Sequence, residues 1–226
     1  MGGKNVVSEA VLNELAGDYT VRRLGGVDRY ATARLIADEA VRLGAVSDKA
    51  FLAYGGTFAD ALSVSSVAAQ KGIPVLLTRT ATLDAGAAAF IDGRGVDDVY
   101  IAGGELAVSD DVEIAVEAFG TRVTRWGGDD RYETAAAVAD GSKSAFGVDF
   151  FRVGIASGTN FPDALAAGAA LGMQDGMLLI THPLALSAPT EGLIVANSAD
   201  ILSVEFFGGT VALSQVVEDR VRELLQ

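Results

Sequence analysis

Short apolar segments alternate along the chain with longer segments of helical pattern. The apolar segments are four to six residues long and are bounded by glycine or polar residues, which predicts buried strands. Three of them cover residues 50–54, 73–78 and 99–102, and three more cover 152–156, 177–180 and 203–207. A further strand is predicted over 121–124, where the chain leads into the next repeat. Continuous apolar strands separated by helices are typical of a parallel sheet that is covered on both faces.

The helical segments begin at residues suited to cap a helix. Asp28 is followed by apolar positions at helical spacing, among them Ala33, Ile36 and Ala37, and Gly44 ends the pattern. Further helices are predicted from Asp60 through residue 70, over 83–91, after Ser109 and over 8–16. Asp60 is interpreted in the same way as Asp28, as the residue that caps its helix.

An internal repeat organises the whole chain. Asp28-Arg29-Tyr30 recurs 102 residues later as Asp130-Arg131-Tyr132, and the segment 58–62 recurs 103 residues later as 161–165. A third, partial copy lies at the N-terminus, where residues 2–8 match 103–109. We therefore divide the chain into the tail of a preceding repeat (1–19), a first repeat (20–119) and a second repeat (120–226).

The pattern and the repeat together predict the fold class. It is α/β, made of tandem Rossmann-like repeats, each a small parallel sheet with helices on both faces. The chain has only four prolines and no linker-like stretch, so the repeats are expected to pack directly on each other. The helix of the tail is expected to pack against the first repeat or to cap it.

Charge and composition exclude several classes of function. Lys and Arg number 17 and Asp and Glu number 30, which gives a net charge of −13 and argues against binding nucleic acid or an anionic membrane surface. The absence of cysteine excludes disulfides and thiol chemistry. No apolar run is long enough to cross a membrane, and the first residues lack the pattern of a signal peptide. Either the protein is cytosolic or the chain is a fragment whose export signal lies outside it.

The sequence contains no motif that specifies an enzyme. Glycine-rich turns at 54–57 and 157–160 match neither the dinucleotide fingerprint nor the P-loop, and we interpret them as tight strand-to-helix turns. His182 is the only histidine, so a histidine-based metal site or a duplicated triad is excluded. We predict no catalytic residue, no metal and no cofactor.

The repeated Asp-Arg-Tyr segment allows two interpretations. Arginine is a planar donor suited to a phosphate or carboxylate, so Arg29 and Arg131 are candidates for ligand binding. In the structural alternative the aspartate caps a helix, the tyrosine packs, and the arginine pairs with Asp60 or Asp163. These two aspartates are themselves either acid–base groups or, as we favour, helix caps.

These motifs resemble the cell-wall-binding repeat, type 2, of Gram-positive surface proteins. The resemblance is carried by Arg23 to Ala33, by Arg125 to Ala135, and by Ala156 to Leu165 with its weaker copy at 58–62. It covers essentially the whole chain. The first repeat departs from the second at Gly56, Thr57 and Ala59, where the second repeat has Thr159, Asn160 and Pro162.

The resemblance implies a non-catalytic anchor that works outside the cell. Family members use tandem copies, typically three with pseudo-threefold symmetry, to hold a surface protein non-covalently on an anionic wall polymer, either teichoic-acid-like or a polysaccharide. Because only two full repeats are present here, a further repeat from the same or another chain would be needed to complete three. The expected location is the extracellular cell wall.

A protein of this charge must bind an anionic polymer through local contacts. The predicted ligand-binding residues are Arg23, Arg29, Arg125, Arg131, Asp60, Asp163, Thr159 and Asn160. A bridging divalent cation is a second possibility, and Trp126 is either a platform for sugar stacking or part of the core. The alternatives to wall anchoring are a self-assembling or protein-interaction module and, less favoured, an enzyme acting on nucleotide or sugar phosphates.

Overall fold

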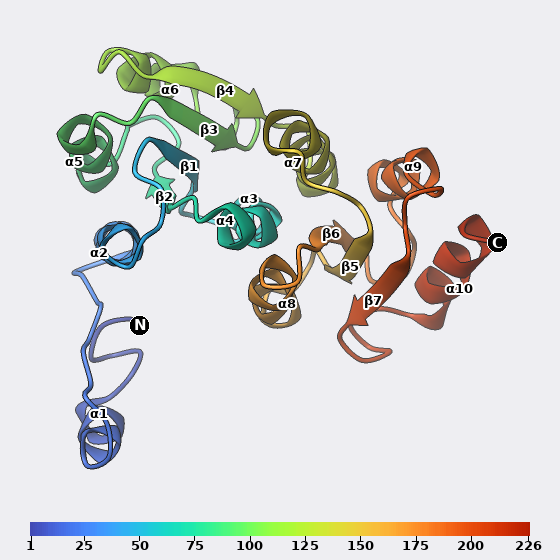
Figure 1. Cartoon of the computed structure of the whole chain (residues 1–226), viewed down its shortest axis with the longest axis horizontal. Coiled ribbons are helices and arrows are strands. Elements are labelled where there is room, and N and C mark those ends of the chain that lie inside the picture. Colours follow the sequence, from blue (N-terminus) through green and yellow to red (C-terminus); the bar gives the residue numbers. More distant parts are fainter.

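Two parallel sheets lie side by side in the computed structural model, which describes residues 1–226 (Figure 1). The first sheet has the order β2-β1-β3-β4 and the second has the order β6-β5-β7. The strands of the first sheet are β1 (Lys49–Tyr54), β2 (Val75–Thr78), β3 (Asp98–Ala102) and β4 (Arg122–Trp126). The strands of the second sheet are β5 (Arg152–Ser157), β6 (Met177–Thr181) and β7 (Ser203–Phe207). Every pairing is parallel, so the predicted fold class of tandem small parallel sheets flanked by helices is confirmed.

Ten helices connect and cover the strands. They are α1 (Glu9–Ala16), α2 (Arg29–Arg42), α3 (Ala59–Ser63), α4 (Ser65–Lys71), α5 (Ala85–Arg94), α6 (Asp110–Glu117), α7 (Arg131–Phe146), α8 (Pro162–Gly172), α9 (Ala188–Ala196) and α10 (Gln215–Leu224). All seven predicted strands are present, with ends that shift by at most two residues. None of the helices is long and apolar enough to span a membrane.

The helix predicted to start at Asp60 differs from the structure in two ways. It is broken at Val64 into α3 and α4, and its N-cap is Phe58 rather than Asp60. The carboxylate of Asp60 turns toward the end of β3, where a Cβ added to Gly103 would lie 3.1 Å from Oδ2. Asp163 likewise lies inside the first turn of α8 and faces Gly208. The prediction that these aspartates cap helices was therefore wrong.

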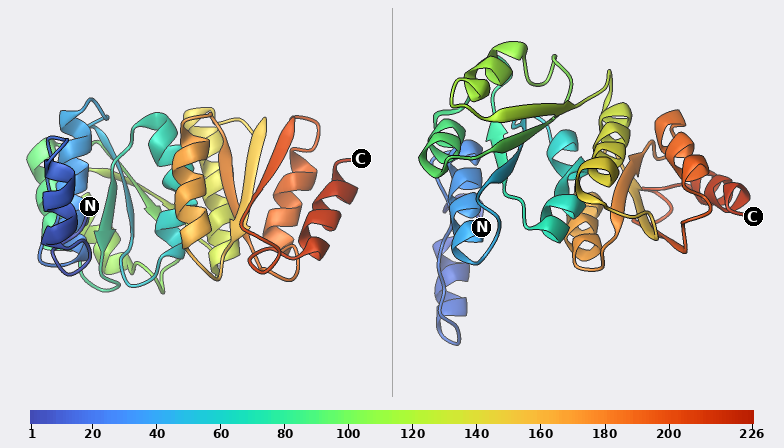
Figure 2. Two further views of the ribbon diagram at one scale, coloured as in Figure 1. Left: turned by 90° about the horizontal axis from the view of Figure 1, so that it is seen from below. Right: turned by 45° about the horizontal axis from the view of Figure 1, so that its top comes forward.

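Two hydrophobic clusters contain residues of both repeats, and a third lies within the first repeat. α4 of the first repeat packs on α8 of the second, and Gly168 lets the helices approach so closely that an added Cβ would meet Ser65 Oγ. The backbone N–H of Leu178, on edge strand β6, donates to Ser66 Oγ at 3.0 Å. This buried bond satisfies a strand edge of one repeat with a side chain of the other. Figure 2 shows the helices standing between the two sheets.

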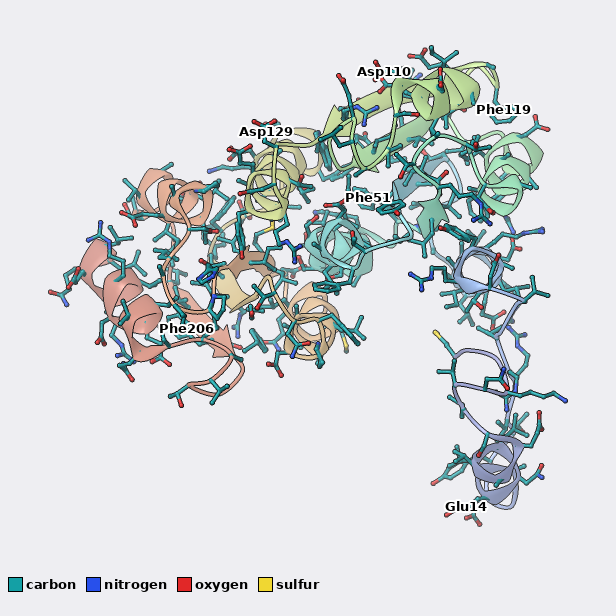
Figure 3. All side chains as sticks on the ribbon, turned by 180° about the vertical axis from the view of Figure 1, so that it is seen from behind. Glu14, Phe51, Asp110, Phe119, Asp129 and Phe206 are labelled. Carbon is teal, nitrogen blue, oxygen red and sulfur yellow. The ribbon has the colours of Figure 1, made fainter.

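An aromatic cluster fills the space between the first sheet and α7. The ring of Phe51, labelled in Figure 3, lies 5.9 Å from those of Tyr100 and Trp126 and 6.2 Å from that of Phe146. Trp126 is only 7% exposed, and an added Cβ on Gly141 of α7 would collide with its indole. Of the two roles considered for Trp126, the structure therefore supports the core and excludes a platform for sugars.

The N-terminal tail keeps the local geometry of a repeat but has no sheet beneath it. The N–H of Gly2 donates to Leu24 O at 2.7 Å, just as that of Gly103 donates to Trp126 O at 2.9 Å. α1 nevertheless extends away from the rest of the molecule and buries no residue (Figures 1 and 3). The expectation that this helix packs against or caps the first repeat was wrong, because none of its residues is buried.

Candidate ligand-binding cleft

A cleft of about 530 Å³ opens where the carboxyl ends of β3 and β4 meet the starts of α3 and α7. It is lined by residues of both repeats: Thr57, Ala59, Asp60, Gly104, Glu105, Leu106, Ala107, Arg125, Gly127, Gly128, Asp129, Asp130, Arg131 and Thr134. We call it the junction cleft. Strand carboxyl ends are the usual place for ligands in parallel α/β sheets. Asp129, labelled in Figure 3, marks its position at the start of α7.

The Asp-Arg-Tyr motif builds one wall of the junction cleft. Asp130 caps α7, accepting from Tyr132 N at 2.8 Å and Glu133 N at 2.9 Å, and Asp28 caps α2 in the same way. The predicted caps at these two positions are confirmed. Tyr132 packs on Gly158 so closely that an added Cβ would lie 2.6 Å from its ring. The motif therefore fixes the glycine-rich turn that follows β5.

Arg131 holds the same turn but does not pair with a carboxylate. Its guanidinium donates one hydrogen bond to Gly158 O at 2.6 Å, and Arg29 donates to Gly55 O in the first repeat. No carboxylate oxygen lies within ion-pair distance of either arginine, so the predicted pairs with Asp60 and Asp163 are absent. The remaining donors of Arg131 are not used by the protein and line the junction cleft.

Asp60 is a buried acid without a partner. It is 7% exposed, and no protein donor hydrogen-bonds to its carboxylate. Burial raises the pKa of Asp60 to about 6, while the positive charge of Arg131 acts in the opposite direction. A carboxylate in this position retains free acceptor sites that face the junction cleft.

Arg23 and Arg125 are already engaged by the protein. Arg125 donates to Gly103 O at 3.1 Å and Val108 O at 2.7 Å, and it pairs with Glu113 at 2.6 Å. Arg23 donates to Gly2 O at 3.0 Å and Val7 O at 2.7 Å in the tail. Arg125 thus ties β4 to the loop before α6, and Arg23 ties the segment before α2 to the loop before α1. Arg125 also lines the junction cleft.

The remaining predicted residues lie at the two ends of the molecule. Thr159 and Asn160 line a second cleft beside the loop after β7, and Arg29 lines a third beside the tail. Asp163 is half-buried next to Gly208. The eight predicted residues therefore do not form one site: only Asp60, Arg125 and Arg131 meet, and they meet between the repeats.

The structure adds acidic residues that sequence reasoning missed. Glu105 and Asp129 line the junction cleft from the loops after β3 and β4. Their position directly after predicted strands was the available signal, since strand carboxyl ends share one edge of a sheet. No group of three acidic or histidine side chains is arranged to hold a metal ion.

Comparison with known proteins adds family information to this geometry. A family model described as Cell wall binding domain 2 (CWB2) matches residues 23–113 and again residues 125–218. The two matches correspond to the two repeats and include the Asp-Arg-Tyr motif of each.

Two curated proteins of Bacillus subtilis (strain 168) are similar over nearly the whole chain. N-acetylmuramoyl-L-alanine amidase LytC is 26% identical over 98% of this chain and 42% of its own length. The protein named amidase enhancer is 28% identical over 99% of this chain and 29% of its own length. The chain thus spans less than half of either relative.

Two solved structures from Clostridium difficile have the same fold. Cwp8 superposes with a TM-score of 0.83 and 25% identity, covering 99% of this chain and 37% of its own. Cwp6 superposes with a TM-score of 0.77 and 22% identity, covering 89% of this chain and 31% of its own.

Proposed function

Because the chain belongs to the Cell wall binding domain 2 family, we propose that it is a non-catalytic module that anchors a surface protein non-covalently to the bacterial cell wall. The observation that carries this proposal is the family match over both repeats. The ligand would be an anionic secondary polymer, teichoic-acid-like or a polysaccharide. The place of action would be the extracellular wall of a Gram-positive cell.

The junction cleft is the best candidate for the polymer site. Arg131 places unused guanidinium donors there, and arginine binds phosphate or carboxylate through such donors. The other predicted contacts, Arg29 at one end and Thr159 and Asn160 at the other, would bind more weakly. The cleft of Arg29 has no buried carboxylate in its lining, and the cleft of Thr159 and Asn160 has no charged residue.

The wall-binding activity is tested by co-sedimentation with purified Gram-positive wall sacculi, before and after acid removal of their secondary polymers. We expect binding that disappears on stripping. Binding that survives stripping would contradict a secondary polymer as the ligand, and absence of binding to both preparations would contradict the proposed function.

Arg131→Ala tests the junction cleft, and Arg29→Ala is its matched control. Both variants lose a hydrogen bond to a glycine carbonyl, but only Arg131 lies in the junction cleft. We expect Arg131→Ala to weaken binding to sacculi about tenfold, the effect of losing a charged hydrogen bond, and Arg29→Ala to leave it nearly unchanged. Equal losses in two folded variants would indicate that the arginines act only on the turns.

An interaction module is the second candidate, and one surface favours it. On α8, Leu165 is 57% exposed, whereas the matching Leu62 on α3 is 6% exposed because the second repeat covers it. This face suits a further repeat from the same or another chain. Light scattering that shows a concentration-dependent rise in mass, without affinity for sacculi, would support this candidate over wall anchoring.

A further inference from the structure

The junction cleft carries more negative than positive charge. Its lining carboxylates are those of Asp60, Glu105, Asp129 and Asp130, and its guanidinium groups are those of Arg125 and Arg131. Arg125 is further neutralised by its ion pair with Glu113. A ligand that is purely anionic would therefore meet one available cation among several carboxylates, and most of its contacts would be repulsive.

Asp60 is the least satisfied of these acids. Asp130 accepts two backbone N–H bonds as a helix cap, and Glu105 and Asp129 are solvated at the rim. Asp60 is 7% exposed, lines the junction cleft and has no donor or ion-pair partner in the protein, and its unpaired carboxylate oxygens are open to the cleft rather than sealed inside the protein. A buried carboxylate without a partner is costly, and a ligand that supplies a donor removes that cost.

Arg131 is the positively charged group of the junction cleft that is available to an anionic part of the ligand. One of its donors holds Gly158 O, and the guanidinium carbon lies 5.7 Å from the ring centre of Phe58. These contacts fix the side chain beside α3 and leave other N–H groups for a ligand. The junction cleft thus presents one fixed cation and one buried, unpaired anion.

We propose that the junction cleft binds a glycan unit that carries both an anionic group and a protonated amino group, with the ammonium against Asp60 and the phosphate or carboxylate against Arg131. This proposal rests on the proposed function and names the class of polymer, a zwitterionic one. A hydroxyl would also donate to Asp60, but an ammonium in addition offsets part of the excess of negative charge. The interaction of the ammonium is strengthened by the low polarity around a buried carboxylate.

Asp163 provides an internal comparison within the same chain. It occupies the matching place in the second repeat and also faces a glycine of positive φ, Gly208. It is half-buried rather than buried, and it does not line the cleft formed by Thr159 and Asn160. Asp163→Asn is therefore the matched control for Asp60→Asn.

The test compares three sugar phosphates that differ only at carbon 2: glucosamine 6-phosphate, glucose 6-phosphate and N-acetylglucosamine 6-phosphate. Affinities for the whole chain are measured at pH 7 by titration followed in NMR spectra. We expect the amino sugar to bind about five-fold or more tightly than the other two, the effect of roughly 1 kcal/mol of charge attraction. Asp60→Asn should abolish that preference, and Asp163→Asn should leave it unchanged.

The same titrations at pH 5 provide a second readout. The carboxyl of Asp60, whose pKa is raised to about 6, is then largely protonated, so the preference for the amine should shrink. The phosphate group is common to all three probes, and its own titration cancels in the comparison.

Equal affinities for the three probes, tighter binding of the hydroxyl or acetamide sugar, or a preference that persists in folded Asp60→Asn would each overturn the proposal. Binding to sacculi is measured separately. A chain that binds sacculi without any preference for the amine would refute this inference and leave the anchoring function intact.

Discussion

At the scale of single residues, Asp60 is the side chain whose ionisation is most affected by its burial. Its folded pKa of about 6 lies above the ordinary value of 3.8, so the folded state favours the protonated form. The contribution of this group to stability is therefore full below about pH 4 and is lost as the pH rises through 6.

Asp60→Asn should accordingly raise the free energy of unfolding at pH 7, by about 1 to 3 kcal/mol, because it removes a buried charge. Asp163→Asn, at a half-buried position, should change it by less than about 0.5 kcal/mol. Urea unfolding at pH 7 and pH 5 measures both, and the gain from Asp60→Asn should shrink at pH 5. A gain that stays constant between the two pH values would contradict the role of the ionised carboxylate.

The residues show which roles a sequence can predict. Asp28 and Asp130 were correctly interpreted as caps, because a cap is a contact within a few residues. Asp60 was not, because its orientation depends on Gly103, which the sheet brings beside it. Arg131 was selected as a candidate, but its partner, Gly158 O, lies 27 residues away and carries no sequence signal beyond a tight turn.

At the scale of elements, the helices α1, α6 and α10 are copies of one repeated helix and differ in how much of their apolar face is buried. α6 and α10 bury their apolar positions, with Val112 and Val116 of α6 fully buried. The matching Val11 and Leu15 of α1 are 44% and 48% exposed. The same pattern thus forms the same helix with and without a sheet to cover it.

Val116→Asp should destabilise the chain by at least about 3 kcal/mol, because it buries a charge without a partner. Leu15→Asp should cost less than about 1 kcal/mol, as for a surface position. Thermal unfolding followed by circular dichroism measures both. A large loss from Leu15→Asp would show that α1 packs in solution on a surface this structure leaves uncovered.

The strands were more predictable than the helix that follows β1. β1, β2, β3 and β6 contain continuous apolar runs, and that pattern is visible without knowledge of their neighbours. The break at Val64 between α3 and α4 has no signal of glycine or proline. The break allows Ser66 Oγ to accept a hydrogen bond from Leu178 N, and these two residues are 112 positions apart in sequence.

At the scale of the whole molecule, the shared hydrophobic clusters make the two repeats one unit. The absence of a linker in the sequence predicted direct packing. The tightness of the contact could not be predicted, because it depends on which faces of α4 and α8 meet. Gly168 and Gly172 are both in contact with α4.

Gly168→Ala should therefore destabilise the chain by about 2 kcal/mol, because its Cβ would overlap Ser65 at the contact between repeats. Gly192→Ala is the control: its added Cβ meets nothing within 4 Å, so a gain of about 0.5 to 1 kcal/mol in helix α9 is expected. Fluorescence of Trp126 and circular dichroism should report coincident unfolding in the wild type. Two separate transitions would contradict a single cooperative unit.

The junction cleft takes Asp60 from one repeat and Arg131 from the next, so the proposed binding site would be complete only where two successive repeats meet. A single repeat would hold none, this chain holds one, and each appended repeat would add another. On a polymer of regularly repeated units, every additional site raises the effective concentration of the next and lengthens residence on the wall. Avidity would then be set by the number of junctions, and a surface protein could be retained more firmly by duplication of a repeat, with no change in any single contact.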